Sequence, residues 1–209
     1  MADQQKAKPK QRRFSPEVRR QMILDAAREL FKDKPNASVD DLATKAGVTR
    51  QLIGQYFPGG GLEMVHEELM QKAFSTFVDQ VLKTDYPPPK SLKEWRKTIP
   101  LTTTRQFEWG VGLGMPWLFA GEGSGLPADM GMARMNLRIG VVPLVIEWSA
   151  AVLPDTPENR LLIQIGYRAI DELIWLVATE KLALEEGVRI AVALWEGIVE
   201  HSAKLLEAA

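Results

Sequence analysis

One arginine and two glutamines share the outer side of a short predicted helix near the start of the chain. Arg50, Gln51 and Gln55 follow Thr49, whose hydroxyl can cap the helix start. The apolar residues recur every three to four positions, which turns them inward and leaves the polar ones outside; they are Val48, Leu52, Ile53 and Tyr56. Arginine and glutamine carry paired hydrogen-bonding groups that match guanine and adenine edges in a major groove. We therefore predict that Arg50, Gln51 and Gln55 read DNA bases.

A second short helix must position that segment. Ser38 and Asp41 have the spacing of a capping box at its start, and Gly47 suits the left-handed turn at its end. Ala43 is small where the two helices must cross. Two helices joined in this way are typical of a helix-turn-helix, in which the polar groups of Ser38, Thr49 and Tyr56 are candidates for positioning phosphates. A helical hairpin with a solvated face is the alternative interpretation.

Composition limits the chemistry that the chain can perform. The 209 residues are 45% apolar and 25% charged, as in an ordinary soluble globular protein, and no apolar run is long enough to span a bilayer. Cysteine is absent, and the two histidines, His66 and His201, are far apart, which argues against common zinc sites. No nucleotide-binding loop is present. We expect a cytoplasmic protein that is not an enzyme and has no cofactor or metal.

Charge is distributed unevenly along the chain. Residues 1–60 contain twelve lysines and arginines against seven aspartates and glutamates, whereas the remainder contains fourteen against twenty. The net charges of +5 and −6 suggest a polyanionic partner for the first part only. Residues 1–14 are basic and nearly free of apolar side chains, so we expect a disordered arm. Such an arm either follows DNA phosphates or only solubilises the protein.

A longer predicted helix precedes the helix-turn-helix. Ser15 can cap it, Pro16 fits its first position, and the residue before Pro35 should end it. Its apolar stripe consists of Ile23, Ala26, Ala27, Leu30 and Phe31. Residues 15–60 should therefore form a three-helix domain around a small core.

The segment Arg20–Phe57 resembles the N-terminal domain of the TetR family of transcriptional repressors. The similarity lies in the order RQMILDAARELF, then SVDDLATKAGVTRQLIGQYF. Two positions depart from the family pattern. Gly54 stands where the family usually has a tyrosine that contacts the DNA backbone, and Phe57–Gly61 lacks the usual lysine. The glycines at 59–61 either offer backbone N–H groups to phosphate or form only a flexible turn.

Residues 61–209 should form a helical ligand-binding and dimerisation domain. A helix from Leu62 to Leu82 is the expected link to it, and Pro100 either kinks or ends the next helix. Aromatic and methionine residues, glycines and prolines concentrate between positions 100 and 150. They either fill an irregular core or line a cavity for a bulky, mostly apolar molecule. The candidate ligand-binding residues are Phe107, Trp109, Met115, Trp117, Met132, Met135, Asn136 and Trp148.

The last two predicted helices carry more apolar surface than one subunit needs to bury. In the family that the chain resembles, these helices pair with those of a second copy in a four-helix bundle. The candidate dimer residues are Leu173, Leu176, Val188, Val192, Trp195 and Val199. Burial wholly within one subunit is the alternative.

These observations predict an all-α protein of about nine helices, with a three-helix DNA-binding domain on a larger helical body. The expected function is a ligand-responsive transcriptional repressor that binds a near-palindromic, double-stranded DNA operator as a homodimer. A bulky, mostly apolar or aromatic effector would release it, and no membrane would take part. A helical small-molecule carrier or enzyme whose helix-turn-helix no longer binds DNA is the alternative.

Overall fold

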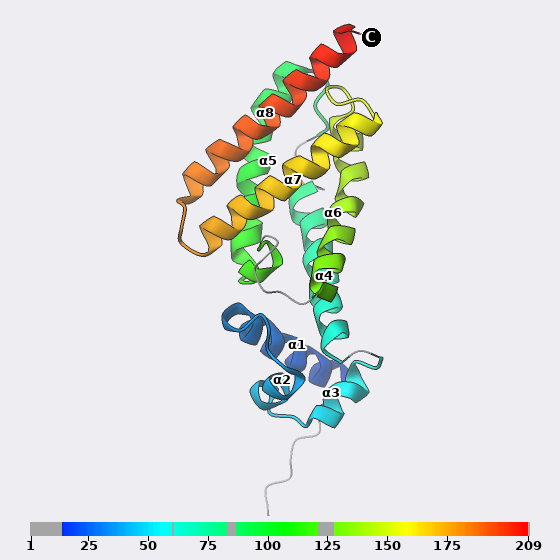
Figure 1. Cartoon of the computed structure of the whole chain (residues 1–209), viewed down its shortest axis with the longest axis vertical. Helices are drawn as coiled ribbons and strands as arrows, with labels where there is room; N and C mark the ends of the chain where they lie inside the picture. The colour runs from blue at the N-terminus through cyan, green and yellow to red at the C-terminus, as the bar shows by residue number, and fades with distance from the viewer. Residues whose placement is uncertain (1–13, 60, 83–86, 121–127, 209) are drawn as a thin grey trace, which may run out of the picture.

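The fold is given by a computed structural model, drawn in Figure 1. It describes residues 14–59, 61–82, 87–120 and 128–208, and for residues 82, 128–138 and 205–208 only the backbone. Within these ranges every regular element is helical, which confirms the predicted all-α class. The count is eight α-helices with two short helical turns, rather than about nine helices. The predicted arm, residues 1–14, lies outside the described residues except for Phe14.

Three short helices form the N-terminal domain, and local caps set where they begin. They are α1 (Pro16–Asp33), α2 (Val39–Ala46) and α3 (Arg50–Tyr56). The side chains of Ser15, Ser38 and Thr49 each accept a backbone N–H in the first turn of their helix. Gly47 ends α2 with a φ of 64°, the left-handed conformation that a residue without a Cβ adopts easily. These predicted helix boundaries are confirmed.

Helix α4 leads from the N-terminal domain into the body of the molecule. It spans Leu62–Phe77 and continues as the π-helical turn η1 (Val78–Leu82), so the predicted helix from Leu62 to Leu82 is helical throughout. Its apolar stripe is buried and consists of Val65, Leu69, Ala73, Phe77 and Val81. In Figure 1 the helix runs downward from the body to α1 and α3.

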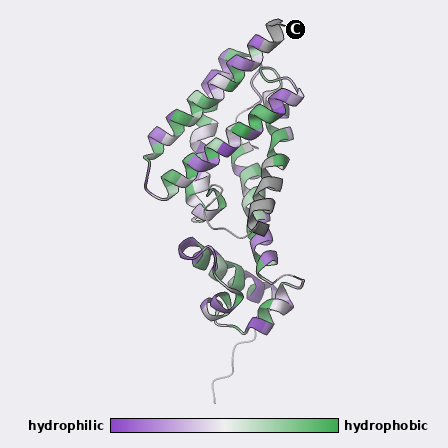
Figure 2. Ribbon diagram, in the orientation of Figure 1, coloured by the Kyte–Doolittle hydropathy of each residue, from purple (hydrophilic) through white to green (hydrophobic). Residues whose placement is uncertain are grey.

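Four long helices complete the body together with the 3-10 turn η2 (Pro116–Leu118). They are α5 (Leu92–Gly112), α6 (Ala128–Ser149), α7 (Pro157–Ala178) and α8 (Leu184–Ala208). Helices α7 and α8 lie side by side in Figure 1, and their apolar residues, green in Figure 2, are distributed along both. Pro100 lies inside α5 and does not end it. The hydroxyls of Thr102 and Thr104 bond to helix carbonyls in the same region.

Two glycines let helices of the body approach closely. A Cβ on Gly110 of α5 would lie 2.6 Å from Ile174 Cγ2 on α7. A Cβ on Gly166 of α7 would lie 2.8 Å from Ile198 Cδ1 on α8. Since real Cβ atoms do not approach this closely, α7 packs where it does because both positions lack a side chain.

None of the described helices is both long and apolar enough to cross a membrane.

Candidate DNA-binding surface and effector cavities

The helix-turn-helix exposes the side of α3 that the sequence predicts. Arg50, Gln51 and Gln55 are exposed, whereas Ile53 is fully buried between the helices. Thr49 fixes the start of α3 by accepting the backbone N–H of Leu52 at 3.2 Å. The polar groups therefore project from a short, capped helix whose opposite side is anchored in the domain core.

Arg50 has an ionic partner in the protein. Its Nη1 atom lies 3.3 Å from Asp40 Oδ2 on α2, and both side chains are about two-thirds exposed, at 69% and 67%. An ion pair so open to solvent contributes little to stability. Arg50 can consequently leave Asp40 for a base or a phosphate at small cost.

The three residues predicted to position phosphates differ in their surroundings. The hydroxyls of Ser38 and Thr49 act as helix caps and remain on the exposed surface beside α3. Tyr56 is half-buried at the end of α3, and its carbonyl accepts a hydrogen bond from Arg20. The hydroxyls of Ser38 and Thr49 already accept backbone N–H groups at the helix starts. If they also contact phosphate, each hydroxyl has both a structural and a DNA-binding role.

Arg20 ties the N-terminal domain to α4, a role that the sequence pattern did not reveal. Its guanidinium donates to Glu68 Oε2 on α4, through Nε at 3.0 Å and Nη2 at 2.5 Å. The same group lies over the ring of Phe57, with 4.3 Å between Cζ and the ring centroid. Lys72 of α4 adds a bond from its Nζ to Gln21 Oε1 at 2.9 Å. The orientation of α3 is therefore linked to α4 through polar contacts.

The body contains two adjoining cavities. The first has a volume of about 540 Å³, its mouth included, and lies between η1, α5, α6, α7 and α8. The second has a volume of about 520 Å³, also with its mouth, and lies between α4, α5, η2, α6 and α7. Gln106 and Tyr167 line both cavities. Mostly apolar concave surfaces with a few polar groups are typical of sites that bind small molecules.

The predicted ligand-binding residues fall into three groups. Trp148 lines the first cavity and Trp109 the second. Phe107, Met115 and Trp117 are buried but line neither cavity, because they fill the core between helices. Met132, Met135 and Asn136 lie outside the residues whose side chains are described. The sequence pattern did not reveal Gln106 and Tyr167. Thr103 and Gln106 are three residues apart, which places them on one side of α5, and this spacing was the available signal.

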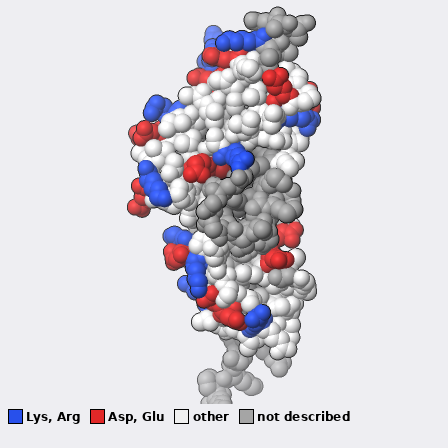
Figure 3. Space-filling model, in the orientation of Figure 1, with Lys and Arg blue, Asp and Glu red and all other residues white. Residues whose placement is uncertain are grey.

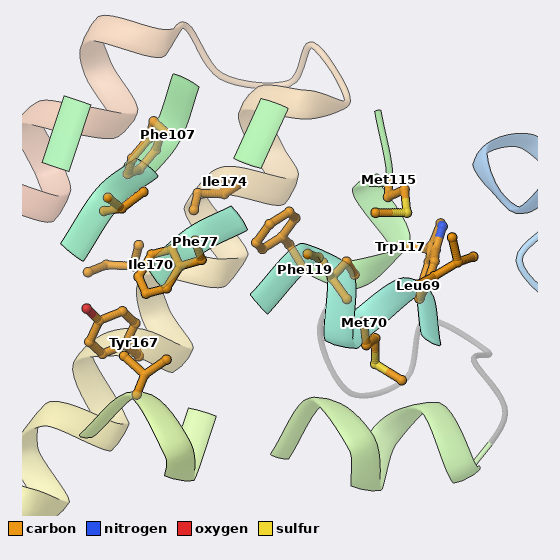
Figure 4. Close-up of a cluster of buried hydrophobic side chains, with 14 of the residues drawn as sticks. Leu69, Met70, Phe77, Phe107, Met115, Trp117, Phe119, Tyr167, Ile170 and Ile174 are labelled. Carbon is orange, nitrogen blue, oxygen red and sulfur yellow. The ribbon is translucent and has the colours of Figure 1, made fainter. Parts of the chain in front are cut away.

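The turn η2 connects the second cavity to the N-terminal domain. Leu118 and Phe119 line that cavity, while the neighbouring Trp117 packs against the other domain. The ring centroid of Trp117 lies 6.0 Å from that of Phe31 on α1 and 6.0 Å from that of His66 on α4. Figure 4 shows the buried side chains that extend from Tyr167 past Phe77 and Phe119 to Trp117. Leu118 in the cavity wall is therefore the direct neighbour in the chain of Trp117, which makes the contact with the N-terminal domain.

The residues predicted to form a dimer interface do not all face outward. Leu173, Leu176, Val188 and Val192 are half-buried on α7 and α8, whereas Trp195 and Val199 are 4% and 2% exposed within one subunit. Trp195 lines the first cavity and packs edge-on against Tyr167. Both side chains face inward because the side of α8 that carries them packs on α5 and α7. The outer face instead exposes Leu161, Ile165 and Ile190, at 56%, 54% and 37%.

The architecture defines a class: a helix-turn-helix domain carried on a helical body with internal cavities. In a comparison with known proteins, residues 23–59 match the family model described as "Bacterial regulatory proteins, tetR family". This segment of the chain is thus similar to the N-terminal domain of the tetR family. A search of curated proteins finds no match.

Solved structures extend the likeness to the body. A TetR-like transcriptional regulator from Rhodococcus sp. RHA1 is 17% identical, with a TM-score of 0.62 over 89% of this chain and 98% of its own. A tetR-family transcriptional regulator from Streptomyces coelicolor is 18% identical, with a TM-score of 0.58 over 90% of this chain and 83% of its own. At such identity the similarity is one of fold, and it includes both the helix-turn-helix and the helical body.

Proposed function

We propose that the protein is a homodimeric, ligand-responsive repressor that binds a near-palindromic DNA operator. The observation that carries this proposal is the exposed side of α3, with Arg50, Gln51 and Gln55, on a TetR-family domain. Arginine pairs with guanine and glutamine with adenine in the major groove. Gly54 between them leaves this surface without a bulky side chain, so the base contacts depend on the three polar residues.

Dimerisation follows from the outer face of α7 and α8. Its exposed apolar side chains include Leu161, Ile165 and Ile190. Figure 3 shows a largely uncharged surface over the upper body, with charged side chains mainly toward its edges. Large apolar side chains that gather on an exposed surface are usually covered by a partner. Two-fold pairing would present two α3 helices to successive major grooves, about 34–36 Å apart.

Ligand response requires that cavity occupancy alter the N-terminal domain. Leu118 and Phe119 in the cavity wall directly follow Trp117, which packs on Phe31 and His66. A ligand that displaces this wall would shift α1 and α4 and, through Arg20, the end of α3. An effector must bind the two conformations unequally, typically by about 1–3 kcal/mol, to change DNA affinity.

Selection from a library of randomised DNA duplexes tests the DNA-binding proposal. We expect recovery of a two-fold symmetric site. Arg50→Ala and Gln51→Ala should each lower the affinity for that site and reduce the base preference at one position in each half. A lost bidentate base contact is worth about 1–3 kcal/mol. Arg189→Ala is the matched control, because Arg189 is equally basic and exposed but lies on α8. Recovery of no preferred sequence would favour the carrier or enzyme alternative.

Sedimentation of the free protein tests the dimer. Leu161→Glu should convert dimers to monomers and lower operator affinity, because it puts a charge into the apolar interface. Leu101→Glu is the control, since Leu101 is 50% exposed on α5, outside the α7–α8 face. A wild-type chain that sediments as a monomer at micromolar concentration would contradict the proposal.

Titration of small aromatic and aliphatic compounds against the operator complex tests the ligand response. We expect a compound that binds the body to lower operator affinity. Trp117→Phe should reduce this effect without changing the affinity for the compound. Trp175→Phe, on α7 and away from the domain contact, is the matched control. A compound that fills the cavities and leaves DNA affinity unchanged would count against the mechanism.

A further inference from the structure

Three buried polar side chains face the cavities without a hydrogen bond from the described part of the chain. Thr103, Gln106 and Tyr167 are 2%, 5% and 7% exposed. The Oγ1 atom of Thr103 has no hydrogen-bond partner within that part. Gln106 and Tyr167 line both cavities, and no hydrogen bond joins their polar groups to another described side chain. A buried polar group without a partner lowers stability, so such groups in a binding site point to a ligand that bonds to them.

Other hydroxyls of the first cavity differ in this respect. Thr102 Oγ1 donates to the carbonyl of Ile99 at 3.1 Å, and Ser149 Oγ donates to that of Val145 at 2.5 Å. These two side chains line the cavity, but helix carbonyls already occupy their protons. The unbonded groups are therefore a distinct set and not a general property of the cavity wall.

Gln106 and Tyr167 stand where the two cavities meet. Each lines both cavities, and the surfaces on either side of them are mostly apolar. Trp95 and Trp195 flank them in the first cavity, and Phe77 and Trp109 in the second. A molecule that extends through both cavities must pass this pair of polar groups.

Charge in the lining argues against an anionic ligand. Among the described side chains of the two cavities the only charged one is Asp171, in the second. Burial, with a contribution from Asp171, raises the pKa of Tyr167 well above its ordinary value of 10.0. The Tyr167 hydroxyl consequently keeps its proton at neutral pH and can donate it.

We infer that the effector is an uncharged, elongated, mostly apolar molecule with a carbonyl or hydroxyl oxygen near its middle, bound by Gln106 and Tyr167. Apolar arms on either side of the oxygen would enter the two cavities. The Gln106 amide and the Tyr167 hydroxyl would donate to the oxygen, and Thr103 lies one helical turn before Gln106 on α5. The regulatory role of this ligand rests on the proposed function. Its chemical class is argued from the cavity residues alone.

Tryptophan fluorescence of the full chain reports binding directly, because Trp95, Trp109, Trp148 and Trp195 line the cavities. The probe is undecan-6-one, compared with undecane, with the isomer undecan-2-one and with undecanoate. We expect undecan-6-one to bind roughly tenfold tighter than undecane, as two hydrogen bonds of ordinary strength allow. The isomer should bind more weakly than undecan-6-one, and undecanoate weakest of the oxygen-containing probes.

Two variants and one control assign the contacts. Tyr167→Phe and Gln106→Leu should each lower the affinity for undecan-6-one by about fivefold and leave the affinity for undecane unchanged. Thr102→Val removes a hydroxyl that is already bonded to the helix and should leave both affinities unchanged. The inference is overturned if undecane or undecanoate binds as tightly as undecan-6-one. It is also overturned if no probe binds, or if the variants weaken every probe equally.

Operator binding measured in parallel separates this inference from the proposed function. Binding of undecan-6-one with the expected selectivity, but without operator release, would uphold the site and refute the ligand response. Operator release that does not depend on Gln106 or Tyr167 would uphold the response and refute the site.

Discussion

The two parts of the molecule satisfy their polar groups in different ways. In the N-terminal domain, Ser15, Ser38 and Thr49 bond to backbone groups three residues away. In the body, Thr103 faces the first cavity, and its hydroxyl has no such local partner in the described chain. The helix caps depend only on residues close in the sequence. The surroundings of a cavity side chain depend on which helices pack around it. The N-terminal helix starts are therefore specified by local contacts, as are those of α5 and α7 in the body, whereas the cavity wall is specified by long-range packing.

Glycines show the same difference. Gly54 on α3 is exposed, and a Cβ there would meet nothing within 4 Å. Gly110 and Gly166 are buried, and a Cβ on either would collide with an isoleucine of a neighbouring helix. Packing does not require a glycine at position 54, but it does at positions 110 and 166, although all three glycines lie inside a helix.

The largest expected effect is that of Gly110→Ala. The new Cβ would lie 2.6 Å from Ile174 Cγ2 and 3.2 Å from Phe119 Cζ, so α5 and α7 must separate. We expect the free energy of unfolding to fall by about 1–3 kcal/mol, the usual cost of overpacking a core. Urea unfolding measures it. Gly112→Ala on the same helix meets nothing within 4 Å and is the control; equal effects at both positions would contradict the packing argument.

Local signals explain why the N-terminal domain could be predicted closely. The capping box of Ser38 and Asp41, the turn at Gly47 and the stop before Pro35 act within a few residues, so their spacing determines the structure. The sequence of the body contains fewer local signals that determine where its helices end. Pro100 does not end α5, which a propensity argument could not decide, because packing against α8 and α7 maintains the helix on both sides.

Ser38→Ala should have an effect of about 1 kcal/mol, smaller than the clash at Gly110. It removes the hydroxyl that accepts the Asp41 N–H and donates to the Asp41 carboxylate. Loss of an N-cap typically costs 0.5–2 kcal/mol. Urea unfolding, with exposed Ser75→Ala on α4 as the control, measures the change. An undiminished stability would mean that α2 is held by the domain core and not by its cap.

The candidate site was predictable to different degrees in the two parts. The exposed face of α3 follows from helical periodicity, since a period of 3.6 residues places Gln51 and Gln55 on one side and Ile53 on the opposite side. The cavity residues do not follow from it. Phe107 and Trp109 are two residues apart on α5, yet only Trp109 lines a cavity. Which aromatic side chains fill the core depends on α4, α6 and α7, whose placement no local pattern gives.

Gly54→Ala should stabilise the protein, the opposite sign to Gly110→Ala. Alanine favours a helix over glycine by up to about 1 kcal/mol, and the site has room for the methyl group. The thermal midpoint should rise by a few degrees. Base selection by Arg50 should be unchanged, which repeats of the duplex selection would check. A fall in stability would show that α3 also depends on long-range packing and would weaken the contrast between the two parts.

The smallest expected effect is the loss of stability at low pH that comes from protonation of Asp41. The Asp41 carboxylate accepts bonds from the Ser38 hydroxyl and from Lys34, which hold its pKa below the ordinary value of 3.8. A carboxyl whose pKa is lower in the folded state stabilises the fold fully above about pH 4 and loses this contribution as the pH falls further. Asp41→Asn should therefore lower the thermal midpoint at pH 6 more than at pH 3.

Asp155 tests whether this behaviour belongs to the N-terminal domain alone. It lies just before the capping residue of α7, and its bonds from Arg160, at 2.6 and 2.7 Å, likewise lower its pKa. Asp155→Asn should show the same pH dependence as Asp41→Asn. If it does, helix starts obey local rules throughout the chain, and the two parts differ only in their interiors. If only Asp41 responds, the division between local and long-range specification extends to the surface of the body as well.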